Sequence, residues 1–245
     1  MKLLDISALK HQARAFSSKK SNSGSSYRYM ERQIRDPFVK QAQNEQFRSR
    51  SSFKLITLLD THRLLPASPH ACILDCGASP GGWSQVISRR ISAAKASAQS
   101  TAPPLPRIIS LDLLPMRPIP GVHFIQGDFF ESPVKREIEQ VLGSRRVGLL
   151  LSDMAPSFTG NRGTDADRTM NLCEDVLAFS EDVLAFGGNM VVKFFMGGAE
   201  PEFRARLRER FERVVVEKPE ASRKQSAEQY FVCIGKRETL KGSVK

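Results

Sequence analysis

The amino-acid sequence predicts an α/β protein with a mostly parallel β-sheet and helices on both faces of that sheet. Three observations predict this fold class. Short apolar runs of strand length alternate with segments whose apolar residues have helical spacing, as is typical of parallel sheets covered by helices. The last two apolar runs are joined by a short polar segment, so these two strands are expected to pair antiparallel. A length of 245 residues and a hydrophobic content of 40% are enough for one domain with a sizeable core.

The expected elements follow in chain order. The first is a helix that begins at Ser51 or Ser52 and runs to about Leu65. Further helices are expected near residues 83–95, 132–142, 168–186 and 200–212. The expected strands are the apolar runs ACILDC, RIISLD, VHFIQ, VGLLLS, NMVVKFF, RVVVEK and QYFVCIG. The predicted sheet therefore has seven strands, of which the last is antiparallel.

Composition separates one domain from two terminal segments. Residues 27–240 are expected to form a single domain, followed by a short tail at 241–245. Residues 92–106 (SAAKASAQSTAPPLP) are rich in Ala, Ser and Pro and have no apolar pattern. We therefore expect a surface insertion without chemistry between the helix near 83–95 and the strand RIISLD.

The first 26 residues differ from the rest of the chain. They hold five Lys or Arg residues against one acidic residue, together with seven serines. Several of their apolar residues could line one face of a helix, and this combination resembles a mitochondrial targeting segment. The prediction is therefore import into the mitochondrial matrix. The alternative is a disordered basic tail that touches RNA, with the protein in the cytoplasm.

Charge and cysteine usage narrow the class of protein. The net charge of +11 and the isoelectric point of about 9.8 favour a polyanionic partner. No apolar run approaches the roughly 20 residues that a membrane span needs, so no membrane partner is expected. The four cysteines form no CxxC pair and no ligand cluster, which predicts reduced thiols and no metal site.

A glycine-rich turn marks the expected ligand site. The stretch LDCGASPGGW, residues 74–83, leads from an expected strand into an expected helix, where bare backbone N–H groups can approach a ligand. Asp112, Asp128 and Asp153 end or follow the next three strands, and open parallel sheets bind ligands at these ends. The turn has neither the GxGxxG spacing of a dinucleotide site nor a GxxxxGK[ST] phosphate loop. Acids suited to ribose hydroxyls and an adenine amine, without a phosphate motif, favour S-adenosylmethionine (SAM) as the cofactor.

Five separated motifs carry a resemblance to a known family. They are LDCGASPGGWSQV, LDLLPMRPIPGVHFIQGDF, LLSDMAP, VVKFF and KPEASRKQSAEQYFV. Together they resemble the FtsJ/RrmJ family of ribosomal RNA 2′-O-ribose methyltransferases, from about Arg35 to Lys236. The resemblance implies a Rossmann-like SAM-dependent methyltransferase fold with seven strands, the last inserted antiparallel. It also implies SAM contacts at Gly81, Gly82, Trp83, Asp112, Asp128 and Asp153.

The resemblance further implies a catalytic Lys-Asp-Lys-Glu tetrad. Its pattern falls on Lys54, Asp153, Lys193 and Glu228. A ribose 2′-hydroxyl is a weak acid, so a nearby base and precise positioning would both assist its attack on a methyl group. Lys193 is the expected base. Lys54 is expected to be a neighbouring cation, whose positive charge favours the neutral, proton-accepting form of Lys193. The two acids are expected to orient the lysines. The alternative is that Lys193 mainly orients the hydroxyl.

The expected partner is large-subunit ribosomal RNA, free or in a pre-ribosomal particle. Within the family, the compact domain looks most like the bacterial-type and mitochondrial large-subunit enzymes, which implies a uridine in the peptidyl-transferase region as the target. Arg48, Arg50, Arg223 and Lys224 are expected to contact RNA phosphates, and a monomer is expected. The alternatives are a tRNA 2′-O-methyltransferase and a ribosome-assembly factor that acts mainly by binding rRNA.

Overall fold

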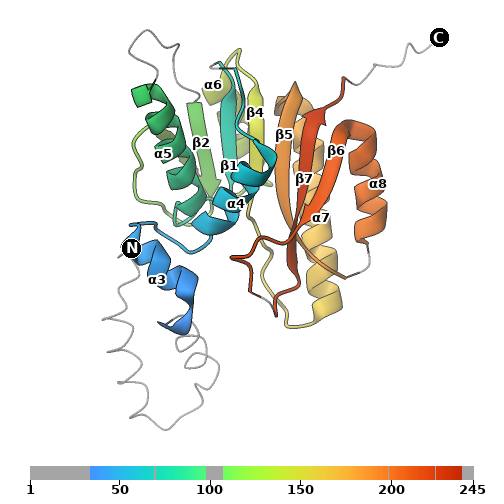
Figure 1. Ribbon diagram of the computed structural model, residues 1–245. Coiled ribbons are helices and arrows are strands. Elements are labelled where there is room, and N and C mark those ends of the chain that lie inside the picture. Colours follow the sequence, from blue (N-terminus) through green and yellow to red (C-terminus); the bar gives the residue numbers. More distant parts are fainter. Residues whose placement is uncertain (1–33, 69, 98–106, 198, 224, 239–245) are drawn as a thin grey trace, which may run out of the picture.

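A computed structural model describes residues 34–68, 70–97, 107–197, 199–223 and 225–238. The predictions for residues 1–26, 98–106, 224 and 241–245 therefore lie outside the described residues. The centre of the structure is a seven-stranded sheet with the order β3-β2-β1-β4-β5-β7-β6 (Figure 1). The strands are β1 (Cys72–Cys76), β2 (Arg107–Asp112), β3 (Val122–Gln126), β4 (Val147–Ser152), β5 (Leu184–Phe195), β6 (Phe211–Glu217) and β7 (Glu228–Lys236).

Six of these strands are parallel to one another, and β7 lies antiparallel between β5 and β6. The predicted fold class is therefore confirmed. The short connection from β6 to β7 has no room for a crossover helix, so the chain can only turn back beside β6. As a result the start of β7 lies at the same edge of the sheet as the ends of β4 and β5.

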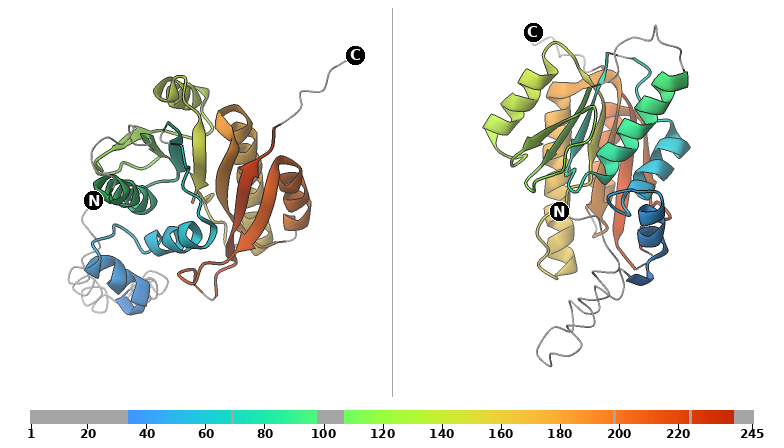
Figure 2. Two further views of the ribbon diagram at one scale, coloured as in Figure 1. Left: turned by 45° about the horizontal axis from the view of Figure 1, so that its top comes forward. Right: turned by 90° about the vertical axis from the view of Figure 1, so that its left-hand side faces the viewer.

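Helices cover both faces of the sheet, which gives three layers (Figure 2). On one face lie α4 (Ser52–His62) and α5 (Gly82–Ser97), and the short α3 (Pro37–Asn44) packs against α4. The other face carries α6 (Ser132–Leu142), α7 (Arg162–Val183) and α8 (Glu200–Arg210). No helix in the described part of the chain is long and apolar enough to cross a membrane.

Two apolar clusters fill the spaces between these layers. Ile73 and Val191 belong to the cluster under α4 and α5, while Leu74 and Val192 belong to the cluster under α6, α7 and α8. Successive side chains of a strand point to opposite faces, so each central strand contributes to both clusters. This is the physical reason why these strands read as continuous apolar runs.

One helix that was not predicted and two shifted boundaries stand out against the sequence prediction. The helix α3 was not expected from its polar sequence; Asp36 caps it by accepting from the Phe38 backbone N–H at 3.0 Å, and Pro37 opens it. The helix expected at 168–186 is α7, which begins at Arg162, where the Asn161 side chain caps the Gly163 and Thr164 N–H groups. Residues 92–97 of the expected insertion continue α5, because Ala-rich sequence favours helix.

Candidate active site

A pocket of about 530 Å³ lies at the edge where the parallel strands end. Its walls come from the segments that follow β1, β2, β3 and β4, and from α7. The strand β1 pairs with β2 on one side and β4 on the other, so the chain leaves the sheet in different directions here. Such a switch point is where open parallel sheets bind ligands.

The pocket brings together the three acids that the sequence predicted. Asp112, Asp128 and Asp153 all line it. Two of these carboxylates are fixed by backbone donors: Asp112 accepts from the Ser79 and Leu114 N–H groups at 2.8 Å each, and Asp128 accepts from the Phe130 N–H at 2.9 Å. A carboxylate has about four lone-pair sites, so both groups retain capacity for a ligand's hydroxyl or amine donors.

The glycine-rich turn contributes Gly77 and Ser79 to the pocket wall. Gly77 has a φ of +79°, and a Cβ there would lie 2.7 Å from the Met154 side chain. Only glycine therefore allows the turn after β1 to meet the loop after β4. Gly77 was not singled out from the sequence, although its place directly after the strand is a usable signal.

At Gly81 and Gly82, the direction in which a Cβ would point is occupied by other parts of the protein. A Cβ on Gly82 would lie 2.1 Å from the Ser49 Oγ, and one on Gly81 would lie 2.9 Å from the Arg48 guanidinium. Neither residue lines the described pocket. A SAM contact by these two residues is therefore left to their backbone atoms and stays a prediction.

The structure places the Trp83 side chain in the core, so a SAM contact by this residue is left to its backbone atoms and stays a prediction. The indole is buried in the core under α4 and α5, where its Nε1 donates to the Ser51 carbonyl oxygen at 2.9 Å. Its ring also packs against Tyr230, with 5.8 Å between the centroids. An aromatic side chain of this size stabilises the fold mainly through burial, so Trp83 anchors α5 to the sheet rather than facing a ligand.

The four residues of the predicted tetrad form two ion pairs beside the pocket. The Lys54 Nζ lies 2.6 Å from the Glu228 Oε1, and the Lys193 Nζ lies 3.1 Å from the Asp153 Oδ1. Lys193 also donates to the Asp153 backbone oxygen. Lys54 comes from α4, Asp153 follows β4, Lys193 is in β5 and Glu228 begins β7. The antiparallel insertion of β7 is what brings Glu228 to the edge that holds the other three.

Tyr230 connects the two ion pairs, and it was not singled out from the sequence. Its hydroxyl donates to the Asp153 Oδ1 at 2.8 Å, and the Lys54 Nζ lies 5.9 Å from its ring centroid. Tyr230 is the register partner of Lys193 and follows Glu228 by two residues, so all three side chains share one face of the sheet. That two-residue spacing in SAEQYFV is the signal that could have found it.

Opposing effects set the ionisation of this cluster. Burial alone would raise the pKa of Asp153, but the Lys193 and Lys54 ammonium groups and the Tyr230 hydroxyl hold it below its ordinary value. Burial, together with the Asp153 carboxylate, raises the pKa of Tyr230 well above its ordinary value. Asp153 is therefore a fixed negative charge and Tyr230 a fixed neutral donor at physiological pH.

A further acid, Asp75, is completely buried beneath the turn. Its Oδ2 accepts from the Ser84 Oγ at 2.5 Å, while its Oδ1 has no hydrogen-bond partner within the described chain. Burial raises the pKa of Asp75 to about 7, against the lowering effect of the Ser84 hydrogen bond.

Two of the expected RNA contacts, Arg48 and Arg50, have guanidinium groups that bond within the protein, and a contact of these groups with RNA stays a prediction. Arg48 donates to the carbonyl oxygens of Pro80, Arg117 and Pro118 at 2.6 to 3.2 Å. Arg50 donates to the Asp36 carboxylate and to the Ala221 carbonyl oxygen. A guanidinium carries five N–H donors, so these bonds hold both groups in place without by themselves excluding a phosphate contact.

The expected RNA contact at Arg223 fits the structure better. Its side chain is 36% exposed, and its Nε lies 3.6 Å from Asp36. In the same turn, the Ser222 hydroxyl donates to the Glu228 Oε1 at 2.8 Å, so this turn also positions a member of the tetrad. Ser222 was not singled out from sequence. The second expected contact of the turn, Lys224, lies outside the described residues.

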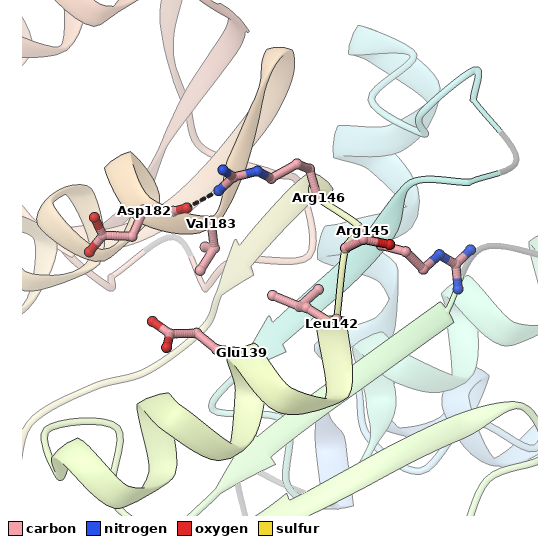
Figure 3. Close-up of a pocket in the computed structure, with 8 residues that line it drawn as sticks. Glu139, Leu142, Arg145, Arg146, Asp182 and Val183 are labelled. Carbon is pink, nitrogen blue, oxygen red and sulfur yellow. Dashed lines mark hydrogen bonds between the residues drawn. The ribbon is translucent and has the colours of Figure 1, made fainter.

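A second pocket lies at the opposite end of the sheet, before β4 (Figure 3). Its two arginines are bonded to backbone carbonyls: Arg146 donates to the Asp182 oxygen, and the Arg145 Nε donates to the His70 oxygen at 2.8 Å. Glu139 and Asp182 offset their charge. Across the described ranges, no group of three or more His, Cys, Asp or Glu side chains is placed to hold a metal ion.

Comparison with known proteins decides the family. The family model described as FtsJ-like methyltransferase matches residues 47–236. The chain belongs to this family. The match contains the glycine-rich turn, the acid-lined pocket and all four residues of the predicted tetrad. The protein is thus a methyltransferase, and its methyl donor is SAM.

Curated relatives are similar over almost their whole length. One is the Ribosomal RNA large subunit methyltransferase E of Xanthomonas campestris pv. campestris, 42% identical over 221 residues, which are 90% of this chain and 99% of the relative. The protein of the same name from Pseudomonas fluorescens is 39% identical over 217 residues, 89% and 98% of the two chains.

Solved structures agree with the fold. A Plasmodium falciparum structure described as a ribosomal RNA methyltransferase has a TM-score of 0.66 and 28% identity, covering 78% of this chain and 98% of that one. Human Methyltransferase-like protein 13 in complex with SAH has a TM-score of 0.50, covering 76% and 80% of the two chains; its 12% identity shows the fold alone.

The FtsJ-like pocket fits SAM on its own evidence. Its volume of about 530 Å³ is in the ordinary range for small-molecule sites. The Asp112 carboxylate at the end of β2 suits ribose hydroxyls, and the Asp128 carboxylate after β3 suits the adenine amine. Phe129 and Phe130 add an apolar wall for a purine ring. Asp153 lies both in this pocket and in the predicted tetrad, so the pocket and the tetrad share this residue.

Proposed function

We propose that the protein transfers a methyl group from SAM to a ribose 2′-hydroxyl of large-subunit ribosomal RNA. The observation that carries this proposal is that two ion pairs, Lys54–Glu228 and Lys193–Asp153, lie directly beside the cofactor pocket. A 2′-hydroxyl is a poor nucleophile until its proton is removed, so the reaction needs a proton acceptor and exact positioning. A base or an acidic heteroatom as the methyl acceptor would not need this arrangement of two lysines and two acids.

The residues divide the chemistry among them. When bound, SAM supplies a methyl group on a sulfonium sulfur, which leaves as a neutral thioether. Lys193 reacts as the neutral amine, after its ammonium has released one proton to solvent. Its Nζ then takes the proton from the 2′-hydroxyl as the ribose oxygen attacks the methyl group, and the nitrogen becomes an ammonium again. Asp153 accepts two hydrogen bonds from that ammonium, through its Oδ1 at 3.1 Å and its backbone oxygen, and so stabilises the product of the proton transfer.

Lys54 and Glu228 form the other side of the site. Lys54 is held by Glu228, whose Oε1 also accepts from Ser222, so this positive charge has a fixed position. A fixed cation stabilises the negative charge that develops on the ribose oxygen during the attack. Tyr230, hydrogen-bonded to Asp153 and lying under Lys54, keeps the two ion pairs in register.

The RNA target and the location are further parts of the proposal. The names of the bacterial relatives and the net charge of +11 support large-subunit rRNA as the substrate. The family resemblance supports a uridine in the peptidyl-transferase region. The basic, serine-rich composition of residues 1–26 supports import into the mitochondrial matrix. A reporter that stays in the cytosol when fused to residues 1–26 would overturn the location alone.

The reaction is tested with labelled SAM and three substrates: large-subunit particles, deproteinised large-subunit rRNA and tRNA. We expect wild-type protein to label one rRNA ribose, and Lys193→Ala to abolish the transfer while SAM still binds. Asp112→Ala is the matched control, in which SAM binding itself is lost. Near-normal turnover by Lys193→Ala would refute its role as the proton acceptor. Label on tRNA would overturn the target, and label on a base would overturn the 2′-hydroxyl as acceptor.

A further inference from the structure

Two aromatic side chains lie at the edge of the tetrad and have no role in the chemistry above. Phe158 is 60% exposed and belongs to the loop that follows Asp153. Phe195 is the last residue of β5 and is partly exposed. Their ring centroids are 5.3 Å apart with an interplanar angle of 86°, an edge-to-face contact. An exposed phenylalanine packed on a second one at a site's edge offers an apolar surface that solvent does not favour.

The sheet register places this surface beside the reacting residues. Phe195 follows Lys193 by two positions and is the register partner of Glu228. Side chains two residues apart on a strand share a face and are separated by about 7 Å. Phe195 therefore lies on the same face as Lys193 and next to Glu228, so the aromatic pair borders the place where a 2′-hydroxyl would be held.

The loop that carries Phe158 is fixed by its own hydrogen bonds. The buried Asp165 accepts from the Thr159 N–H at 2.7 Å, the Thr159 hydroxyl at 2.8 Å and the Gly160 N–H at 3.2 Å. Arg168 donates to the Ser157 carbonyl oxygen at 3.3 Å. These contacts flank Phe158 on both sides, so its exposed position is built into the structure before any ligand arrives.

The other exposed phenylalanines differ from Phe158 in their surroundings. Phe130 is 54% exposed and lines the cofactor pocket, where it has a role already. Phe186 is 62% exposed but lies seven residues before Lys193 on β5, about 23 Å away along the strand. Phe158 alone of these three combines exposure with contact to a residue beside the tetrad.

We infer that Phe158 and Phe195 form a stacking platform for the base of the nucleotide that is methylated. This inference rests on the proposed 2′-O-methylation, because the base and the 2′-hydroxyl are carried by adjacent carbons of one ribose. With the 2′-hydroxyl held at Lys193, the base of the same nucleotide lies within a few ångströms of the tetrad. The Phe158 ring offers that base an aromatic face, and stacking requires the base to be unpaired and splayed out of any helix.

The experiment measures binding separately from catalysis. The probes are a fluorescent oligouridylate of about 12 nucleotides and an abasic oligoribonucleotide of equal length and charge. Phe158→Ala is expected to weaken binding of the oligouridylate about tenfold and to leave the abasic probe unaffected. Phe158→Trp should retain the affinity for oligouridylate, and Phe186→Ala, equally exposed but remote, should change neither affinity. SAM binding is measured for every variant and is expected to stay at the wild-type value.

Methyl transfer to deproteinised large-subunit rRNA provides the second readout. Phe158→Ala should raise the KM for RNA about tenfold with little change in the KM for SAM. Equal loss of affinity for both oligonucleotides, or a parallel loss of SAM binding, would show a structural role of the loop and overturn the platform. Unchanged oligouridylate affinity in Phe158→Ala would overturn it as well. Methylation by the wild type at a position other than a ribose would instead refute the proposed function, while the binding arm still decides on the platform.

Discussion

The buried carboxyl of Asp75 makes the stability of the protein depend on pH in a predictable direction. Asp75 is completely buried, and its pKa is raised from 3.8 to about 7 by burial. Between these values the folded state keeps a proton that the unfolded state has released. The free energy of unfolding therefore falls as the pH rises through this range, and the loss is complete only above about pH 7. Asp75→Asn keeps the shape of the side chain and removes this titration.

The magnitude follows from the two pKa values. A rise from 3.8 to about 7 corresponds to a total cost on the order of 4 kcal/mol once the buried carboxyl is ionised. Between pH 5 and pH 8 the wild type is expected to lose about 2 to 3 kcal/mol relative to Asp75→Asn. This difference is large against the total stability of an ordinary domain, so it is measurable.

Urea unfolding at pH 5 and pH 8 tests this prediction with three proteins. The quantity to compare is the free energy of unfolding of Asp75→Asn minus that of the wild type, which should increase by about 2 to 3 kcal/mol from pH 5 to pH 8. Asp60→Asn is the control, because the Asp60 side chain is 54% exposed. A difference between wild type and Asp75→Asn that is the same at both pH values would refute the reasoning.

Two further predictions concern residues that hold the site together. Arg50→Ala removes the bonds to Asp36 and to the Ala221 carbonyl oxygen, which fix the turn that positions Glu228. We expect about a tenfold lower kcat with unchanged SAM affinity, measured by single-turnover methylation and calorimetry, with partial recovery in Arg50→Lys; a fall in SAM affinity alone would contradict this role. Gly81→Ala forces a side chain into a φ of +107° and within 2.9 Å of Arg48. Urea unfolding should show a loss of about 2 to 4 kcal/mol, against about 1 kcal/mol for Gly121→Ala, where a Cβ meets nothing within 4 Å; equal losses would show that backbone strain alone sets the cost.

Patterns of neighbouring residues were enough to predict the fold class. All seven strands were expected near their observed positions, because a strand that is buried on both faces has a continuous run of apolar residues in the sequence. The acids Asp112, Asp128 and Asp153 were predicted to share a site for a topological reason: parallel strands end at one edge. The tetrad came from the family resemblance, and the structure brings its four members together as two ion pairs.

The side-chain partners were decided only by the tertiary structure. From the sequence, Arg48 and Arg50 were expected to be solvent-facing cations that contact RNA. In the structure, carbonyl oxygens and the Asp36 carboxylate from distant segments accept hydrogen bonds from them. A sequence does not show which acceptors a guanidinium will meet, since those acceptors come from positions up to 171 residues away. Trp83 likewise follows a ligand-binding turn in sequence, but the close packing of α4 against α5 buries its indole. Local patterns determine which strands and helices form, whereas long-range packing determines which charges are paired and which aromatic rings, such as that of Phe158, stay exposed for a substrate.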